Sequence, residues 1–239
     1  MEQIKTSLSR LRLPGMSACL RTLEETRQVH ELSFTDGLKL LLQAETDQRE
    51  TSRLERLVKN AAFRYRASIE ELSFEAARGM EKSKVIDLST GSYIRNGESI
   101  LIVGATGCGK SFLATALGMQ ACRQGHSVIY HNMQKLMARF KIARLEGNSI
   151  SLFDKLAKTD LLILDDFGLA PMDNQQQLDF MEIIEDRHAR KATIITSQWP
   201  VSNWFDIFKE ETLADAILDR IVHTSHRFEL IGESLRKKR

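Results

Sequence analysis

From residue 99 onward, the chain alternates short apolar runs with stretches of helical periodicity. The stretch 174–190, for example, places Leu178, Met181 and Ile184 on one helical face. Continuous apolar strands that alternate with amphipathic helices are typical of a parallel sheet covered by helices on both faces. The pattern therefore predicts an α/β fold with a five-stranded parallel sheet. The predicted strands cover residues 99–103, 127–131, 161–166, 193–198 and 227–231.

The first 75 residues show helical periodicity alone, which predicts a small all-helical domain in front of the α/β core. The Pro-Gly pair at 14–15 breaks a first helical segment. Thr35 or Asp36 is suited to cap the start of a longer helix. Apolar residues recur along that helix at Leu38, Leu41, Leu42, Leu54, Leu57, Val58 and Ala61. The predicted domains are 1–75 and 76–239, with 76–98 as the connection before the first strand.

Composition is that of an ordinary soluble globular protein, with 42% hydrophobic and 28% charged residues over 239 positions. The formal net charge of +2 neither requires nor excludes a nucleic-acid partner. Three widely separated cysteines, Cys19, Cys108 and Cys122, favour neither a disulfide framework nor a zinc site and indicate a reducing compartment. No apolar run approaches the roughly 18 residues of a membrane span, and the N-terminus lacks a signal-peptide core. We therefore expect a cytoplasmic protein without a membrane partner.

A glycine-rich motif, GATGCGKS, follows the first predicted strand. It fits the pattern GxxxxGK[ST], in which backbone N–H groups encircle phosphates at the start of a helix. Lys110 is placed to reach the β- and γ-phosphates of a nucleotide, and the Ser111 hydroxyl is placed to bind Mg²⁺. The alternative is a turn that merely joins a strand to a helix, which the Lys-Ser ending disfavours. The candidate nucleotide-binding residues are Gly104, Ala105, Thr106, Gly107, Cys108, Gly109, Lys110, Ser111 and Phe112.

An acidic pair, Asp165 and Asp166, ends the predicted strand LLILDD, 55 residues after Lys110. Asp165 is placed to hold Mg²⁺ through water, and Asp166 to orient the water molecule that attacks the γ-phosphate. Taken alone such a pair often only starts a turn, but after a phosphate-binding loop it indicates nucleotide hydrolysis. One complete strand–helix unit separates the two motifs, which favours the additional-strand ATPases. A small-molecule P-loop kinase would need a substrate pocket and usually an arginine-rich lid, and the sequence shows neither.

Further polar candidates lie beyond the acidic pair. Ser197 and Gln198 leave the next predicted strand, where either can hydrogen-bond the γ-phosphate or the attacking water, or simply form a polar strand end. Arg220 ends a predicted helix, and Asp219 is its one acidic neighbour in the local sequence. A guanidinium matches the charge that develops on a transferred phosphoryl group and is often supplied by a neighbouring subunit. A surface arginine that caps the helix end is the alternative.

Basic residues recur in the predicted long helix, where residues 49–66 carry six basic and two acidic side chains. On a helix, Asn60 and four arginines fall on one face at intervals of 4, 3, 4 and 4, with Lys59 nearby. Such a stripe suits the phosphates of duplex DNA without reading bases. A solvated face with ion pairs four residues apart is the alternative. The candidate DNA-binding residues are Arg49, Arg53, Arg56, Lys59 and Arg64.

These motifs together resemble the AAA+ ATPases of the IstB/DnaC group, and most closely the IstB-type transposition helpers of bacterial insertion sequences. The likeness spans nearly the whole chain. More specific than the phosphate-binding loop are ILDRIVH and GESLRKK combined with the ELSFTDGLKLLLQAE segment of the helical region.

The resemblance implies ATP and Mg²⁺ as cofactors, Asp166 as the catalytic carboxylate, a sensor-like residue near Gln198 and an arginine finger at Arg220. It also implies that Arg236, in GESLR, senses the phosphates. Asp166 stands where many AAA+ proteins have Glu, and Gln198 where Asn is commoner. The group lacks the usual C-terminal helical lid, and only eight residues follow Ile231 here, too few for one.

Two functions follow from this resemblance. In the first, the protein is an ATP-dependent helper that oligomerises on duplex DNA as a ring or filament, remodels it, and recruits or activates an IstA-type transposase. In the second, it is a replicative helicase loader of the DnaC type. The ATPase core is the same for both, so the N-terminal domain separates them, and its basic stripe favours DNA.

Overall fold

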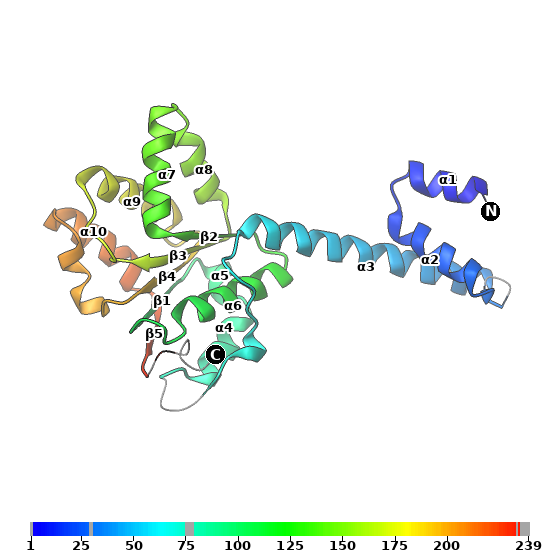
Figure 1. Cartoon of the computed structure of the whole chain (residues 1–239), viewed down its shortest axis with the longest axis horizontal. Coiled ribbons are helices and arrows are strands. Elements are labelled where there is room, and N and C mark those ends of the chain that lie inside the picture. Colours follow the sequence, from blue (N-terminus) through cyan, green and yellow to red (C-terminus); the bar gives the residue numbers. More distant parts are fainter. Residues whose placement is uncertain (1, 29–30, 75–78, 233, 235–239) are drawn as a thin grey trace. The chain divides into compact units, whose positions relative to one another are not determined.

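The computed structural model describes residues 2–28, 31–74, 79–232 and 234. By their internal contacts, the two parts of the chain are Met1–Arg56 and Leu57–Arg239. The division falls inside one long helix, α3 (Phe34–Ala61), and not at residue 75 as predicted (Figure 1). The residues that follow Arg56 therefore belong to the larger unit, which also contains the nucleotide-binding motifs.

The N-terminal unit is helical, as predicted, with α1 (Glu2–Arg10), α2 (Pro14–Glu25) and the first part of α3. Glu45 of α3 is 5% exposed, and its carboxylate accepts hydrogen bonds from the backbone N–H groups of Gly15 (2.8 Å) and Met16 (3.2 Å). It thereby satisfies N–H groups in the first turn of α2. The cap of α3 was predicted wrongly, because the Ser33 hydroxyl accepts from the N–H of Asp36 at 3.1 Å.

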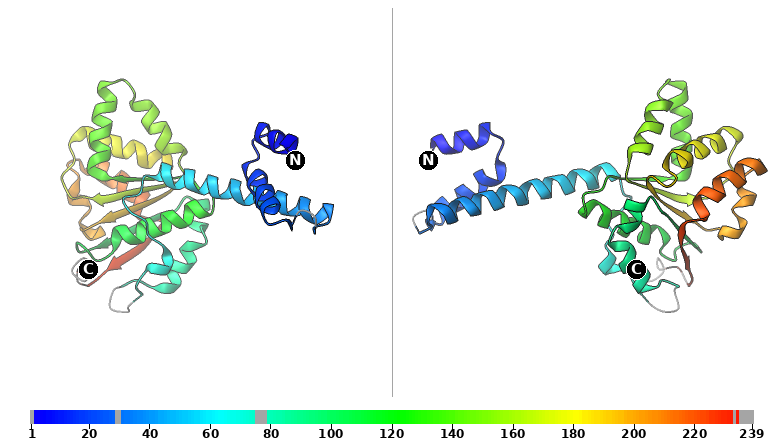
Figure 2. Two further views of the ribbon diagram at one scale, coloured as in Figure 1. Left: turned by 45° about the vertical axis from the view of Figure 1, so that its right-hand side comes forward. Right: turned by 180° about the vertical axis from the view of Figure 1, so that it is seen from behind.

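Five parallel strands form the sheet of the larger unit, which confirms the predicted α/β fold (Figures 1 and 2). Their order across the sheet is β2-β3-β4-β1-β5. The strands are β1 (Ser99–Gly104), β2 (Val128–Asn132), β3 (Leu161–Phe167), β4 (Ala192–Ser197) and β5 (Ser225–Leu230). Because all five run the same way, the carboxyl ends of β1, β3 and β4 meet at one edge of the sheet.

Helices cover both faces of this sheet (Figure 2). On one face lie α4 (Lys82–Ser89), α5 (Ser92–Asn96) and α6 (Lys110–Arg123). The other face carries α7 (Met133–Leu145), α8 (Ser149–Lys158), α9 (Asn174–Arg187) and α10 (Glu211–Val222). Short 3-10 helices occupy Ile69–Glu71, Val201–Asn203 and Phe205–Ile207. The connection predicted over 76–98 contains two short helices, α4 and α5.

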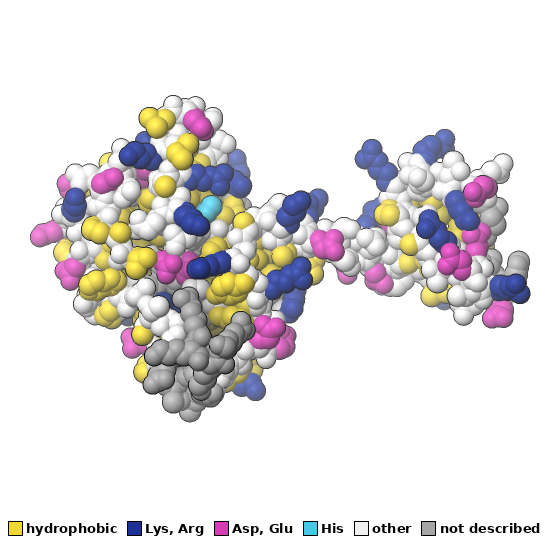
Figure 3. Space-filling view, in the orientation of Figure 1, with side chains coloured by type: hydrophobic (Ala, Val, Ile, Leu, Met, Phe, Trp, Pro, Cys, Tyr) yellow, Lys and Arg dark blue, Asp and Glu magenta, His cyan; other side chains and the backbone are white. Residues whose placement is uncertain are grey.

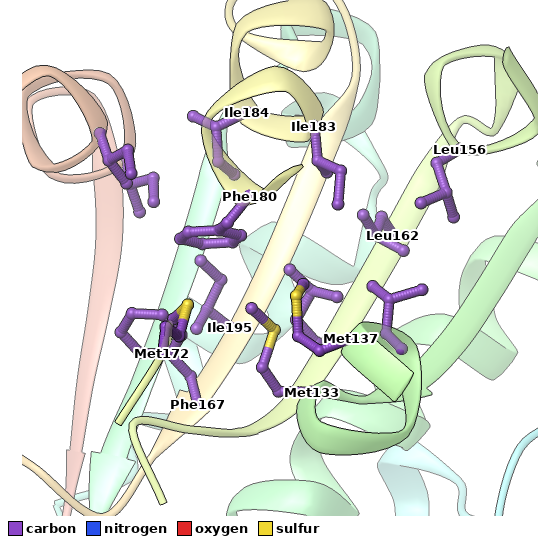
Figure 4. Close-up of a cluster of buried hydrophobic side chains, with 14 of the residues drawn as sticks. Met133, Met137, Leu156, Leu162, Phe167, Met172, Phe180, Ile183, Ile184 and Ile195 are labelled. Atoms are coloured by element: carbon purple, nitrogen blue, oxygen red, sulfur yellow. The ribbon is translucent and has the colours of Figure 1, made fainter. Parts of the chain in front are cut away.

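The main core lies between the sheet and α7 to α10, and Figure 4 shows part of it. Phe180, from α9, projects toward the strands beside Ile195 of β4. Met133 and Met137 of α7 fill the adjacent space. All four side chains are at most 2% exposed, so this layer contributes several kcal/mol of hydrophobic stabilisation, at about 25 cal/mol per Å² buried. A closely packed core of this kind fixes where the strand ends lie.

Candidate nucleotide-binding site

The loop between β1 and α6 requires glycine. Gly104 and Gly107 have φ angles of +150° and +84°, in the region that side chains other than glycine rarely adopt. A Cβ atom at Gly104 would lie 2.2 Å from the carbonyl oxygen of Leu230, and one at Gly107 would lie 2.2 Å from the Ser234 hydroxyl oxygen. The chain that leaves β5 thus lies directly against the loop. Arg236, predicted to sense the phosphates, lies outside the described residues.

Lys110 begins α6 and is 6% exposed. Its Nζ donates hydrogen bonds to the carbonyl oxygens of Gly104 (2.7 Å) and Ala105 (2.9 Å), so that the loop curls around the ammonium group. The positive charge therefore sits at the N-terminus of a 14-residue helix, whose free N–H groups also favour anions. Together they form the anion-binding end of the candidate site.

Asp165 connects four segments at the edge of the sheet. Its side chain is 1% exposed, and one carboxylate oxygen accepts from the Ser111 hydroxyl at 2.8 Å. The hydroxyls of Tyr130 on β2 and Thr196 on β4 donate to the same carboxylate. Ser111 and Asp165 thus present neighbouring oxygen atoms, the donor type that Mg²⁺ prefers, so the two residues fit the predicted metal.

Asp166 lies where the β3–β4 register shifts between Leu164 and Phe167. Its φ angle is +61°, a strained conformation for a residue other than glycine, and such strain clusters at functional sites. The Asn132 amide donates to its carboxylate at 2.9 Å. Burial, and then the charge of Asp165, raise the pKa of Asp166, while the Asn132 hydrogen bond opposes the rise. Both acidic candidates are therefore held at the carboxyl end of β3 by side chains of the neighbouring strands β2 and β4.

The two sensor candidates have different surroundings. The Thr106 hydroxyl in the loop donates to Gln198 Oε1 at 2.8 Å, which joins Gln198 to the phosphate-binding motif. The Ser197 hydroxyl instead donates to the Phe167 carbonyl at 2.9 Å and accepts from the Trp199 N–H at 3.1 Å. Because both contacts of Ser197 are to backbone, Gln198 is the better candidate of the two.

The Arg220 side chain contacts α9 and its own helix, α10. Its Nε lies 2.5 Å from Glu185 Oε2 on α9, and it also donates to the Ala216 carbonyl at 2.8 Å. Among the described residues, no hydrogen bond or ion pair joins Arg220 to Lys110, to Asp165 or to the neighbouring carboxylate. Asp219 is the one acidic neighbour of Arg220 in the local sequence, whereas Glu185 lies 35 residues earlier in the chain and becomes adjacent through helix packing.

Sequence reasoning missed the three residues that hold the acidic pair in place, which are Tyr130, Asn132 and Thr196. They lie near the carboxyl ends of β2 and β4, the two strands that flank β3. The strand order supplies the signal that would identify them, because side chains at the same edge of neighbouring parallel strands meet.

The candidate DNA-binding residues fall into separate groups. The N-terminal unit has a cavity of about 290 Å³, lined by Arg12, Pro14, Glu45, Gln48, Arg49, Ser52, Arg53 and Arg56. Arg12, which precedes α2, was not predicted. Arg49 also pairs with Glu45 at 2.8 Å, so the alternative of an ion pair four residues apart applies to it. Acidic side chains are interspersed with the basic ones over this unit (Figure 3).

Lys59 and Arg64 belong to the larger unit. Lys59 is exposed on α3. The placement of Arg64 on the same helical face was wrong, because α3 ends at Ala61 and Ala62 has a φ angle of +54°. The positive charge of Arg64 instead acts on Asp166, where it opposes the overall rise in the pKa of that carboxyl group.

Comparison with known proteins decides the family. The family model for IstB-like ATP binding proteins matches residues 6–239. The chain belongs to this family. An insertion sequence ATP-binding protein of Sinorhizobium fredii is 40% identical to the IstB-like chain over 230 residues, which cover 96% of this chain and 94% of the relative. The ATP-binding protein of insertion sequence IS21 from Pseudomonas aeruginosa is 29% identical over 238 residues, covering 100% and 90% of the two chains.

A solved structure shares the fold of the IstB-like chain. The crystal structure of the DnaC helicase loader superposes with a TM-score of 0.58 and 19% identity, over 74% of this chain and 99% of that one. The likeness confirms the predicted α/β fold of the core. Within the described part of the chain, no helix combines the length and apolar character that crossing a membrane requires.

Proposed function

We propose that this IstB-like protein binds and hydrolyses ATP in the presence of Mg²⁺. One observation carries the proposal, namely that Lys110, Ser111, Asp165 and Asp166 converge at the carboxyl ends of β1 and β3. Phosphate release from ATP, measured with Mg²⁺ and with a chelator in its place, tests it. Release above the chelator background is expected, and no release from a fully folded protein in the presence of DNA would contradict it.

Different residues of the site bind the phosphates, hold the metal and activate the attacking water. Lys110 and the loop N–H groups bind the phosphates, and Ser111 and Asp165 would hold the metal. When bound, Mg²⁺ neutralises charge on the phosphate oxygens. Asp166 orients a water molecule and accepts its proton while the water oxygen attacks the γ-phosphorus. The bond between the γ-phosphorus and the bridging oxygen breaks, and that oxygen leaves with ADP. Gln198, linked to Thr106, extends this polar edge toward the γ-phosphate.

The Asn132 contact gives a pH-dependent prediction. Replacement of Asn132 by alanine removes the hydrogen bond that holds the pKa of Asp166 down, so that pKa rises further. Because Asp166 has to be ionised to act as a base, the acid limb of the pH profile of hydrolysis moves to higher pH. Steady-state kcat/KM measured across the acidic range checks this. An acid limb that stays in place or moves to lower pH contradicts the role of Asn132.

We further propose that the protein acts as a transposition helper that assembles on duplex DNA and engages a transposase. The family match and the 40% identity to an insertion sequence ATP-binding protein support this. A DnaC-type loader is the alternative, and its support is a shared fold at 19% identity. In the helper, Arg220 leaves Glu185 and contacts the ATP of a neighbouring subunit, which makes assembly dependent on nucleotide.

The arginine cavity of the N-terminal unit is the proposed DNA contact. Changing both Arg53 and Arg56 to glutamate should weaken binding to duplex DNA about tenfold or more and reduce the slope of log affinity against log salt by about two. Lys39→Glu, an exposed charge reversal on the same helix but outside the cavity, is the matched control. Fluorescence anisotropy of a labelled duplex over a salt series measures both quantities. Unchanged affinity and slope in the double variant would instead favour a helicase loader.

A further inference from the structure

Gln198 leaves the sheet between the phosphate-binding loop and the acidic pair. Strand β4 lies between β1 and β3, and its last residue, Ser197, is level with Val103 of β1 and Phe167 of β3. The phosphate-binding loop begins directly after Val103, and the acidic pair directly precedes Phe167. Gln198, which follows Ser197, is therefore placed where the two halves of the candidate site meet.

The main chain on either side of Gln198 is held by side chains. The Ser197 hydroxyl donates to the Phe167 carbonyl at 2.9 Å and accepts from the Trp199 N–H at 3.1 Å. The indole N–H of Trp204, a fully buried residue, donates to the Trp199 carbonyl at 3.0 Å. Because these contacts fix the backbone, the freedom left to Gln198 is rotation of its own side chain.

Thr106, in the phosphate-binding loop, holds the end of that side chain. Its hydroxyl donates to Gln198 Oε1 at 2.8 Å. A glutamine amide has an acceptor oxygen at one end and two N–H donors at the other. Within the ranges that the structure describes, no protein group accepts from Gln198 Nε2. With Oε1 bound to the loop, the N–H end of the amide is the end that can bind a ligand.

This orientation of the amide suits an anion. The phosphate oxygens of ATP are hydrogen-bond acceptors, so the N–H end of Gln198 attracts them and the carbonyl end repels them. In the observed arrangement the Thr106 O–H donates to the carbonyl end, and the N–H end can donate to a phosphate oxygen. Hydrogen bonds in such a chain polarise and strengthen one another. Thr106 therefore stabilises the orientation in which Gln198 binds a phosphate.

We propose that Thr106 is a positioning residue for Gln198, and that together they make the site prefer ATP to ADP. The Thr106 hydroxyl holds the carbonyl end of the amide, and the N–H end donates to the γ-phosphate, which ADP lacks. The inference rests on the proposed binding and hydrolysis of ATP. It deepens that function because it gives the loop threonine a side-chain role in addition to its backbone N–H.

Thr106→Val tests the proposal, because valine keeps the branched shape and the backbone N–H but cannot donate to Gln198. The affinities of the full-length chain for ADP and for the ATP analogue with an NH group between the β- and γ-phosphates are measured with Mg²⁺. We expect affinity for the analogue to fall about tenfold, as for a lost hydrogen bond to a charged group. Affinity for ADP and the thermal unfolding midpoint should not change.

Two results of this measurement overturn the proposal. One is unchanged affinity for the analogue, and the other is an equal loss of affinity for ADP, which would assign the hydroxyl to the phosphates that both nucleotides share. Thr106→Ser keeps a hydroxyl and should bind the analogue as wild type does. Thr22→Val, the same change at an exposed threonine of α2, is the control and should leave both affinities unchanged.

A double variant tests whether Thr106 acts through Gln198. Gln198→Ala should weaken binding of the analogue at least as much as Thr106→Val does. In the Gln198→Ala background, Thr106→Val should change that affinity by less than about twofold, because the group it orients is already absent. A further tenfold loss in the double variant would show that the hydroxyl acts on the nucleotide by itself, and would overturn the proposal.

These affinities do not depend on hydrolysis. If wild type binds the analogue but releases no phosphate from ATP, hydrolysis is refuted while the comparison of analogue and ADP still decides the role of Thr106. If a folded wild-type protein binds neither nucleotide, both proposals are refuted.

Discussion

Replacing Lys110 by methionine is expected to reduce ATP hydrolysis by at least about 100-fold and to weaken ATP binding strongly. Methionine fills much of the buried space of the lysine but carries no charge, so the phosphates lose the buried ammonium group at the start of α6. Phosphate release and the affinity for a fluorescent ATP analogue measure the two effects.

The control for this variant is Lys141→Met, an exposed position on α7. Circular dichroism and thermal unfolding establish that both variants are folded, which matters because Lys110 also donates to two loop carbonyls. Binding and hydrolysis at wild-type levels in a folded Lys110→Met protein would contradict the assignment of the site.

Arg220→Ala is expected to lower hydrolysis about 1,000-fold while ATP binding persists, because an arginine finger stabilises charge in the transition state of a neighbouring site. Mixing Arg220→Ala with Lys110→Met should recover part of the activity. At some interfaces the Lys110→Met subunit supplies Arg220 to a partner whose Lys110 is intact. Phosphate release from each variant alone and from the mixture measures this complementation.

Two outcomes would contradict the interface role. Hydrolysis at the wild-type rate in Arg220→Ala would remove Arg220 from the reaction. Lost hydrolysis without recovery on mixing would indicate that Arg220 acts within its own chain. Glu185→Gln serves as the companion variant, because it removes the ion-pair partner and leaves the arginine in place.

The Arg220–Glu185 ion pair is compatible with an exchange of partners. The Arg220 and Glu185 side chains are 27% and 55% exposed, and ion pairs at such surfaces contribute about 0–1 kcal/mol. A phosphate group, which binds a guanidinium through two parallel hydrogen bonds, competes readily with so weak a contact. We therefore expect Arg220 to move to a neighbouring ATP without unfolding α10.

Local patterns in the sequence were enough to predict the sheet and the central motifs. All five predicted strands are present within two residues of their expected bounds, because buried parallel strands leave continuous apolar runs. The contact between Ser111 and Asp165 follows from two motifs at the ends of strands in the same sheet. Such features depend on residue type and spacing alone, which a single sequence contains.

Other parts of the site depend on packing between distant segments. Glu185 meets Arg220 only because α9 and α10 pack together, and Tyr65 stacks on Phe112 only because α3 ends at Ala61. Helical periodicity continued past Ala61 in the prediction, and so Arg64 was assigned to the wrong surface. The short helices α4 and α5 were missed because eight and five residues are too few for a clear periodic signal.

The central claim is that ATP controls an assembly of this protein on DNA, and the mass of the complex tests it most directly. Multi-angle light scattering of the full-length protein with duplex DNA should give a large oligomer with ATP and Mg²⁺. Smaller species should be found with ADP or without nucleotide, because the neighbouring arginine then lacks the γ-phosphate as its partner. Monomers of the same mass under every condition would contradict the account.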